Sequence, residues 1–66
     1  MSIADKLKQL RTDKNMTQQQ LADALNINQG MLSRWESGVT APSLKLRRLI
    51  ADYFEMSVDE IFGNNR

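Results

Sequence analysis

Few residues of this chain have side chains suited to catalysis or metal binding. Its 66 residues include no histidine and no cysteine, which excludes a thiolate nucleophile, an imidazole base and the usual zinc and iron sites. Asp59 and Glu60 are adjacent and fall near the expected start of a helix, where the helix dipole favours carboxylates. Acid–base catalysis instead needs carboxylates placed around a cleft. We therefore expect neither an enzyme nor a metal or cofactor site.

Polar groups that form directed hydrogen bonds are the more informative side chains, and they gather in residues 28–37. Gln29, Ser33 and Arg34 fall on the outer side of a helix predicted there. A glutamine amide can bond an adenine edge in two places, and an arginine can bond either a guanine or a phosphate. Whether these side chains can form such hydrogen bonds depends on how the neighbouring helices position this helix.

Capping signals predict five helices, and period-2 strand patterns are absent from the sequence. Thr17-x-x-Gln20 and Ser57-x-x-Glu60 are capping boxes, in which the two side chains bond each other's backbone N–H groups. The expected helices cover residues 3–14, 17–25, 28–37, 42–55 and 57–63. Left-handed stops are expected at Asn15, Asn26 and Gly38. The prediction is an all-α single domain over residues 1–63, with a frayed tail at 64–66.

The second and third predicted helices are separated by the short turn Asn26–Ile27–Asn28. Ala22 is small and lies on the buried face, so the next helix can approach its backbone closely. A braced second helix with a polar outer face is what a DNA-binding helix-turn-helix requires. Helix pairs of this spacing also occur in proteins that do not bind DNA.

The charge of the chain is unevenly distributed. The net charge is +1, but residues 1–48 carry eight basic and four acidic side chains, or +4. Residues 49–66 carry one basic and four acidic side chains, or −3. We expect the first part to face DNA and the second to face away. The low total predicts weak non-specific binding, so base contacts should carry more of the discrimination.

Four segments resemble the Cro/repressor-type helix-turn-helix family, also called XRE. They are MTQQQLADAL at 16–25, NINQGMLSRWESG at 26–38, APSL at 41–44 and ADYFEMSVDEI at 51–61. The resemblance covers residues 3–62 with the spacing kept throughout. It implies a compact five-helix lambda-repressor-like domain, with the helix-turn-helix at its second and third helices.

The resemblance also implies which residues contact DNA. The expected base contacts are Gln29, Gly30, Ser33 and Arg34. The expected phosphate contacts are Gln18, Asn28, Thr40 and Lys45. Gly30 costs about 1 kcal/mol relative to alanine within a helix, and it either permits close approach to DNA or is simply tolerated. The loop 39–41 contains no Lys or Arg, which departs from the more basic members and weakens the expected phosphate grip.

Two further expectations concern pairing. By resemblance, Arg11 and Glu36 form a structural ion pair that sets the angle of the third helix. The fourth helix departs from the family because Arg47 stands at a usually apolar position. Its apolar residues form two lines along the helix: an expected core line of Ile50 and Phe54, and a second line of Leu46, Leu49, Ile50 and Tyr53. Both lines cannot face so small a core, which implies either a small shift in packing or an exposed patch for dimerisation. The candidate patch residues are Leu46, Leu49 and Tyr53.

The leading functional prediction is a sequence-specific double-stranded DNA-binding transcription regulator, of repressor or phage/plasmid type. It would insert residues 28–37 into the major groove, as a two-fold dimer whose recognition helices lie about 34 Å apart on a palindromic operator. An antitoxin or a restriction-system controller protein, each with a protein partner, is the alternative within the fold. A helical protein-interaction module without DNA binding is the alternative outside it. With no apolar run long enough to span a membrane, we expect a cytoplasmic protein.

Overall fold

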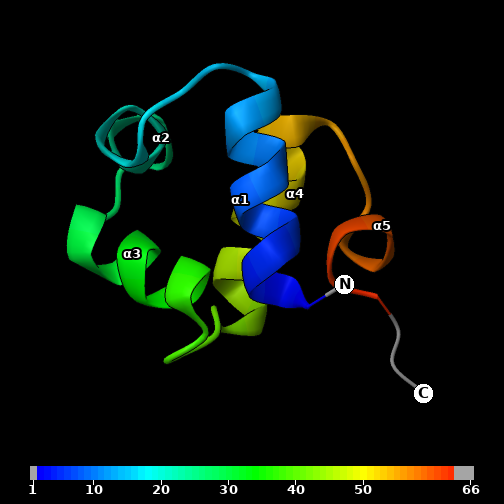
Figure 1. Ribbon diagram of the computed structural model, residues 1–66. Coiled ribbons are helices and arrows are strands. Elements are labelled where there is room, and N and C mark those ends of the chain that lie inside the picture. Colours follow the sequence, from blue (N-terminus) through cyan, green and yellow to red (C-terminus); the bar gives the residue numbers. More distant parts are fainter. Residues whose placement is uncertain (1, 64–66) are drawn as a thin grey trace.

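A computed structural model describes residues 2–63, and within that range the chain is entirely helical. The five helices there are α1 (Ile3–Asp13), α2 (Gln18–Leu25), α3 (Gln29–Ser37), α4 (Leu44–Phe54) and α5 (Val58–Phe62). In Figure 1, α2 and α3 lie on one side of α1 and α4, and α5 lies on the other. The predicted all-α architecture of five helices is confirmed for these residues. The tail expected at 64–66 falls outside them.

Side-chain caps fix the starts of the helices. Both predicted capping boxes are present, at Thr17 with Gln20 and at Ser57 with Glu60. The Asn28 side chain accepts a hydrogen bond from the Gly30 N–H at 2.7 Å. In contrast to the predicted start at residue 42, α4 begins at Leu44, because the Ser43 hydroxyl is used as its N-cap.

Left-handed residues end several of the helices. Asn15 and Asn26 have φ values of 57° and 59°, and Gly38 has φ 84°, as the sequence predicts. Glu55 adopts the same conformation, with φ 58°, at the end of α4. Nothing in its residue type indicates this, because glutamate has no intrinsic preference for positive φ.

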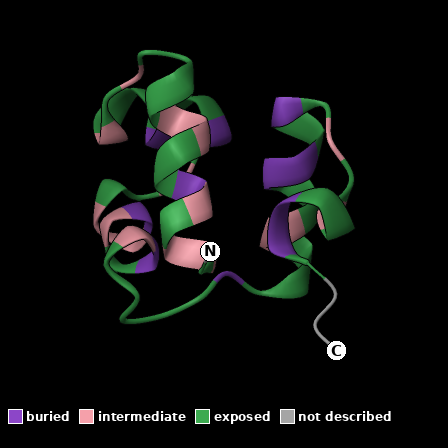
Figure 2. Ribbon diagram, turned by 45° about the vertical axis from the view of Figure 1, so that its right-hand side comes forward, coloured by how far each residue is buried: buried purple, intermediate pink, exposed green. Residues whose placement is uncertain are grey.

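The core lies where the inner faces of the helices meet (Figure 2). Its largest fully buried side chains are Leu7, Leu21, Leu32 and Ile50. Because each of α1 to α4 contributes one of them, burial of these four side chains holds α3 against the body of the molecule. Trp35 adds a second buried contact on the inner face of α3.

The two apolar lines of α4 differ in how far they are buried. Ile50 and Phe54 are buried, whereas Leu49 remains 41% exposed and Tyr53 37% exposed. Leu46 is half-buried and packs against the core. The line of Leu46, Leu49 and Tyr53 is therefore only partly buried, and apolar surface remains on the outside of α4.

Candidate nucleic-acid interface

The turn between α2 and α3 is fixed by backbone hydrogen bonds and by one small side chain. Asn26 takes the left-handed conformation, and the Ile27 N–H donates to the Ala22 carbonyl at 2.9 Å. Ala22 is fully buried. Because it has only a methyl group, α3 can cross α2 at short range. The turn and the close crossing together give α3 a single orientation relative to α2.

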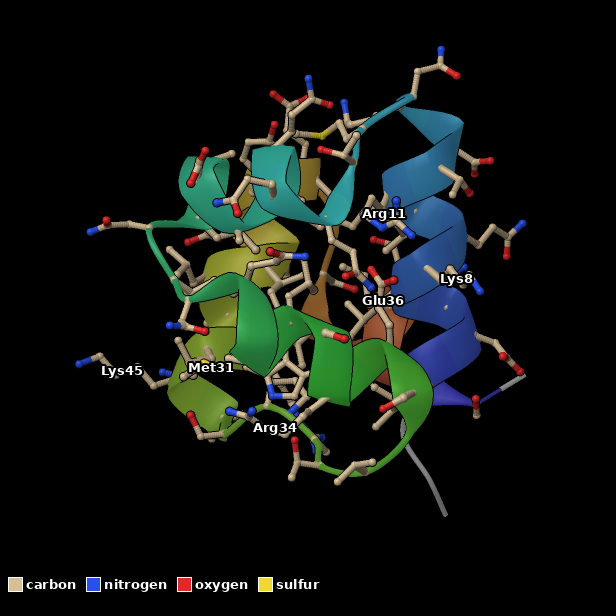
Figure 3. The ribbon with its side chains drawn as sticks, turned by 60° about the vertical axis from the view of Figure 1, so that its left-hand side comes forward. Lys8, Arg11, Met31, Arg34, Glu36 and Lys45 are labelled. Carbon is tan, nitrogen blue, oxygen red and sulfur yellow. The ribbon has the colours of Figure 1, made fainter. Side chains whose placement is uncertain are left out.

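The outer face of α3 carries the residues predicted to contact bases. Gln29 and Arg34 are exposed, and Gly30 and Ser33 are half-exposed. Leu32 and Trp35 lie on the opposite face and are buried. In Figure 3, Arg34 and Lys45 lie on one side of the view, while Lys8 and Arg11 lie on the other. The structure therefore places all four predicted base contacts on the side of α3 that is turned away from the core.

A chain of side-chain hydrogen bonds runs from α1 to the first residue of α3. Arg11 donates to both carboxylate oxygens of Glu36, from Nε to Oε2 at 2.8 Å and from Nη2 to Oε1 at 3.0 Å. Glu36 Oε1 also accepts from Gln18 Nε2 at 3.1 Å. Gln18 Oε1 accepts in turn from Gln29 Nε2 at 3.3 Å. The structure thus forms the expected ion pair and links it to Gln29.

The Gln18 links were not predicted from the sequence. Gln18 stands in the first turn of α2, where an ordinary exposed polar residue is equally compatible with the pattern, and its partners are 18 and 11 residues away. A third contact of this cluster was also missed, because Arg11 Nη1 donates to the Met16 carbonyl at 2.7 Å. These contacts depend on how α1, α2 and α3 pack together, which spacing along one helix does not report.

Gly30 has a local reason to lack a side chain. A Cβ atom built there would lie 2.9 Å from the Asn28 Oδ1 atom, which is the atom that caps α3. For any larger residue at position 30, either the Asn28 side chain or the backbone of α3 must shift. Close approach to DNA is therefore not needed to explain the glycine, although it remains compatible with it.

The four predicted phosphate contacts occupy different settings. Gln18 and Asn28 stand at the N-terminal ends of α2 and α3, where backbone N–H groups and the helix dipole favour anions. Thr40 is exposed in the loop after α3. Lys45 is exposed too, but it lines a groove on α4 together with leucine side chains. Three of the four therefore lie at or next to the ends of the helix-turn-helix helices.

Two acidic residues of the C-terminal part of the chain lie away from α3. Asp59 and Glu60 lie in the first turn of α5, and Figure 1 shows α5 on the side of the molecule opposite α3. These two carboxylates therefore do not face a ligand bound on the α3 side. The carboxylates of α5 are thus separated in space from the candidate interface, while the predicted orientation of the whole charge division stays a prediction.

Residues 7–61 match the model of a protein family described as helix-turn-helix. The chain belongs to the helix-turn-helix family. The match covers both helices of the motif and the helices that support it, and it confirms the predicted Cro/repressor-type family. The chain is therefore a DNA-binding domain of the kind that transcription regulators carry.

Relatives of this helix-turn-helix chain include regulators of opposite action. It is 41% identical over 63 residues to the transcriptional activator BcrR of Enterococcus faecalis, covering 96% of this chain and 31% of that protein. It is 36% identical over 63 residues to the cryptic phage CTXphi transcriptional repressor RstR of Vibrio cholerae, covering 96% of this chain and 56% of the repressor. The chain thus spans about a third to a little over half of these proteins.

The fold has a counterpart among solved structures. A transcriptional regulator from Listeria innocua superposes with a TM-score of 0.88 and 28% sequence identity, covering 98% of this chain and 61% of that one. The helix-turn-helix and its supporting helices are thus shared as one unit. Within residues 2–63, none of the helices is long and apolar enough to cross a membrane.

Proposed function

We propose that this chain is the DNA-binding part of a transcription regulator that inserts α3 into the major groove of a palindromic operator as a two-fold dimer. The observation that carries the proposal is the chain of hydrogen bonds from Arg11 through Glu36 and Gln18 to Gln29. It holds the first exposed amide of α3 in one orientation before DNA arrives. Preorganisation of this kind lowers the ordering cost of binding.

Gln29 is the principal base contact in this proposal. Its side-chain amide has two N–H donors and one carbonyl acceptor, and Gln18 accepts one of the two donors. The remaining N–H and the carbonyl match the N7 acceptor and the N6 donor of adenine. Ser33 and Arg34 lie one turn further along α3 and complete the base-reading set, together with the backbone at Gly30.

Gln18, Asn28 and Thr40 are the proposed phosphate contacts. The N-terminal turns of α2 and α3 supply backbone donors beside the first two. Thr40 supplies a hydroxyl in a loop that has no basic residue, so the phosphate grip there relies on neutral hydrogen bonds. Lys45 has a competing role, because it lines the groove on α4.

Repression by occupying an operator is the regulatory action that this proposal favours, since occupation needs only the proposed contacts of α2, α3 and the following loop with DNA. A similar domain is part of an activator in BcrR and of a repressor in RstR. Whether such a protein activates or represses transcription thus depends on more than this domain. The proposal includes no catalytic step, and it places the protein in the cytoplasm, where operator DNA is accessible.

Selection of bound sites from a random DNA pool tests the proposal. We expect enriched sites with two inverted half-sites about one helical turn apart. Affinity for the winning site should fall with salt, with a slope of roughly 0.9 per neutralised phosphate. Flat, negligible binding to random and selected DNA at all salt concentrations contradicts the proposal and favours a protein-interaction module.

A further inference from the structure

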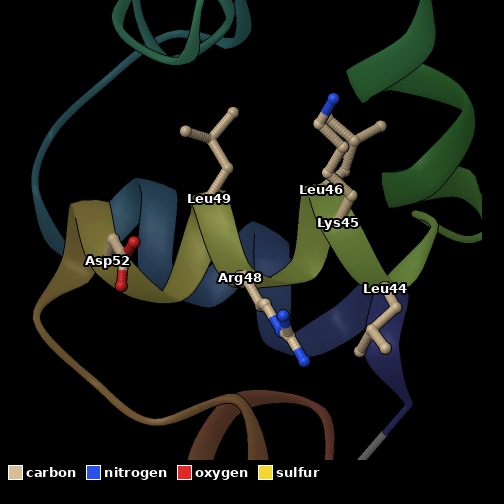
Figure 4. Close-up of a pocket in the computed structure, with 6 residues that line it drawn as sticks. All are labelled: Leu44, Lys45, Leu46, Arg48, Leu49 and Asp52. Atoms are coloured by element: carbon tan, nitrogen blue, oxygen red, sulfur yellow. The ribbon is translucent and has the colours of Figure 1, made fainter.

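The outer face of α4 carries an apolar groove of about 490 Å³. Leu44 is 59% exposed and Leu49 is 41% exposed, and Figure 4 shows them along the same stretch of α4. The groove is lined by Leu44, Lys45, Leu46, Arg48, Leu49 and Asp52. Leucines this exposed lose contact with water when a partner covers them, which favours association.

The groove differs from the patch predicted from the sequence. Tyr53 does not line it, because its hydroxyl contacts Met16 Sδ at 3.7 Å and its ring meets Phe54 edge-on with centroids 5.1 Å apart. Tyr53 therefore packs back against its own chain. Leu44 takes its place, and the exposed apolar surface lies nearer the N-terminal end of α4.

The charges along the groove are ordered. Lys45, Leu49 and Asp52 are spaced at i, i+4 and i+7, so they share one face of the helix. Lys45 and Arg48 make the N-terminal part basic, and Asp52 makes the C-terminal part acidic. A helix face with this order is complementary to the same face running in the opposite direction. A second copy of the chain therefore offers a complementary surface.

We infer that two copies pair through α4, antiparallel about a two-fold axis near Leu49. Leu49 of one copy then meets Leu49 of the other, and Lys45 of each lies opposite Asp52 of its counterpart. The interface is isologous, because the same patch serves both subunits. Lys45 cannot serve a phosphate and Asp52 of the second copy at once, so the pairing replaces the phosphate contact expected of it.

The pairing keeps both recognition helices available. In Figure 4, α3 lies on one side of α4 and α5 on the other. A two-fold axis perpendicular to the paired α4 helices leaves the two α3 helices on the same side of the dimer. This deepens the proposed function and rests on it for the operator symmetry. Self-association itself requires no DNA and is measured without it.

Sedimentation equilibrium of the DNA-free protein, up to millimolar concentration, tests the pairing. Leu49→Glu places two carboxylates at the axis, and Asp52→Lys places Lys45 opposite another lysine; each should raise the dimer dissociation constant at least tenfold, because like charges at an interface repel. The double variant Lys45→Asp/Asp52→Lys restores opposite charges and should regain dimerisation. Val39→Glu is the matched control, since Val39 is 69% exposed outside α4 and should leave the constant unchanged.

A wild-type protein that stays monomeric throughout this range overturns the pairing. The pairing is also overturned if Leu49→Glu leaves the dimer intact, or if the double variant Lys45→Asp/Asp52→Lys does not regain dimerisation. Circular dichroism of each variant checks that the helices are retained. Salt-dependent DNA binding by a protein that stays monomeric refutes the α4 pairing and the dimeric part of the proposed function, but leaves DNA binding through α3 standing. A dimer without DNA binding refutes DNA binding and leaves the α4 pairing standing.

Discussion

Arg11 on α1 and Glu36 in the last turn of α3 form a two-pronged ion pair, with donor–acceptor distances of 2.8 and 3.0 Å. The Glu36 side chain is only 3% exposed and that of Arg11 only 12%. Burial removes water from both charges, so each depends on the other for its solvation. The pair therefore joins the last turn of α1 to the helix that carries the candidate base contacts.

Arg11→Met should lower the free energy of unfolding by about 3 kcal/mol, because it leaves the Glu36 carboxylate buried without its charge partner. The same change should weaken DNA binding, since Gln18 and Gln29 lose the anchored carboxylate to which their hydrogen bonds lead. Urea denaturation measures the first effect and a DNA titration at low temperature the second. Unchanged stability together with unchanged affinity would remove the pair from the mechanism.

The double variant Arg11→Met/Glu36→Met separates the two effects. Replacing both charges by apolar side chains removes the stranded carboxylate, so we expect most of the lost stability to return. DNA affinity should remain reduced, because Gln18 now loses the Glu36 carboxylate to which its amide donates. Recovery of both properties would show that the pair serves stability alone.

Local features of the fold were predictable from sequence, and long-range ones were not. The caps at Thr17 and Asn28 and the stop at Gly38 depend on a few neighbouring residues, so their chemistry is visible in the sequence. The bond from Gln18 to Glu36 joins helices that meet only after packing. The Arg11–Glu36 pair was expected because a family resemblance supplied the long-range information. The extent of the α4 groove depends on which leucines the core absorbs, and the apolar pattern leaves that undecided.

Gln29→Ala should relax the preference at one base position of the operator by about 1–3 kcal/mol, because it removes a two-point contact to a base edge. Gln18→Ala should weaken all sites by roughly 1 kcal/mol through the lost phosphate contact. It should also relax the preference at the Gln29 position, because Gln29 loses the side chain that orients its amide. Binding to a panel of single-base operator variants measures both. A Gln18→Ala protein that changes preference at that position with no general loss of affinity would remove Gln18 from the phosphate contacts.

Gly30→Ala should fail to stabilise the protein, although alanine is favoured over glycine in helices by about 1 kcal/mol. The new Cβ meets the Asn28 Oδ1 atom, and loss of that cap costs about 1 kcal/mol. In an Asn28→Ala background the obstacle is gone, so the same change should stabilise by about 1 kcal/mol. Thermal unfolding of the four proteins of this cycle measures the coupling. A full gain in the wild-type background would contradict the capping explanation.

Arg47 replaces the usual apolar residue of α4 by making two contacts that an apolar side chain cannot make. Its Nε donates to the Pro42 carbonyl at 2.9 Å, and its guanidinium carbon lies 5.2 Å from the centroid of the Phe62 ring. From its place on α4, Arg47 thus contacts both the loop that follows α3 and the helix α5. Arg47→Ala should lower the free energy of unfolding by about 1–2 kcal/mol, whereas Arg47→Met should cost less because it keeps the packed stem.

A double-mutant cycle of Arg47→Ala with Phe62→Leu isolates the contact between the guanidinium and the ring. Leucine retains much of the apolar burial at position 62 but removes the aromatic face, so the cycle should give a coupling of roughly 0.5–1 kcal/mol. Urea denaturation of the wild type, both single variants and the double variant provides the four free energies. A coupling of zero would mean that Arg47 acts only through the Pro42 carbonyl, and then Phe62→Leu should cost the same whether residue 47 is arginine or alanine.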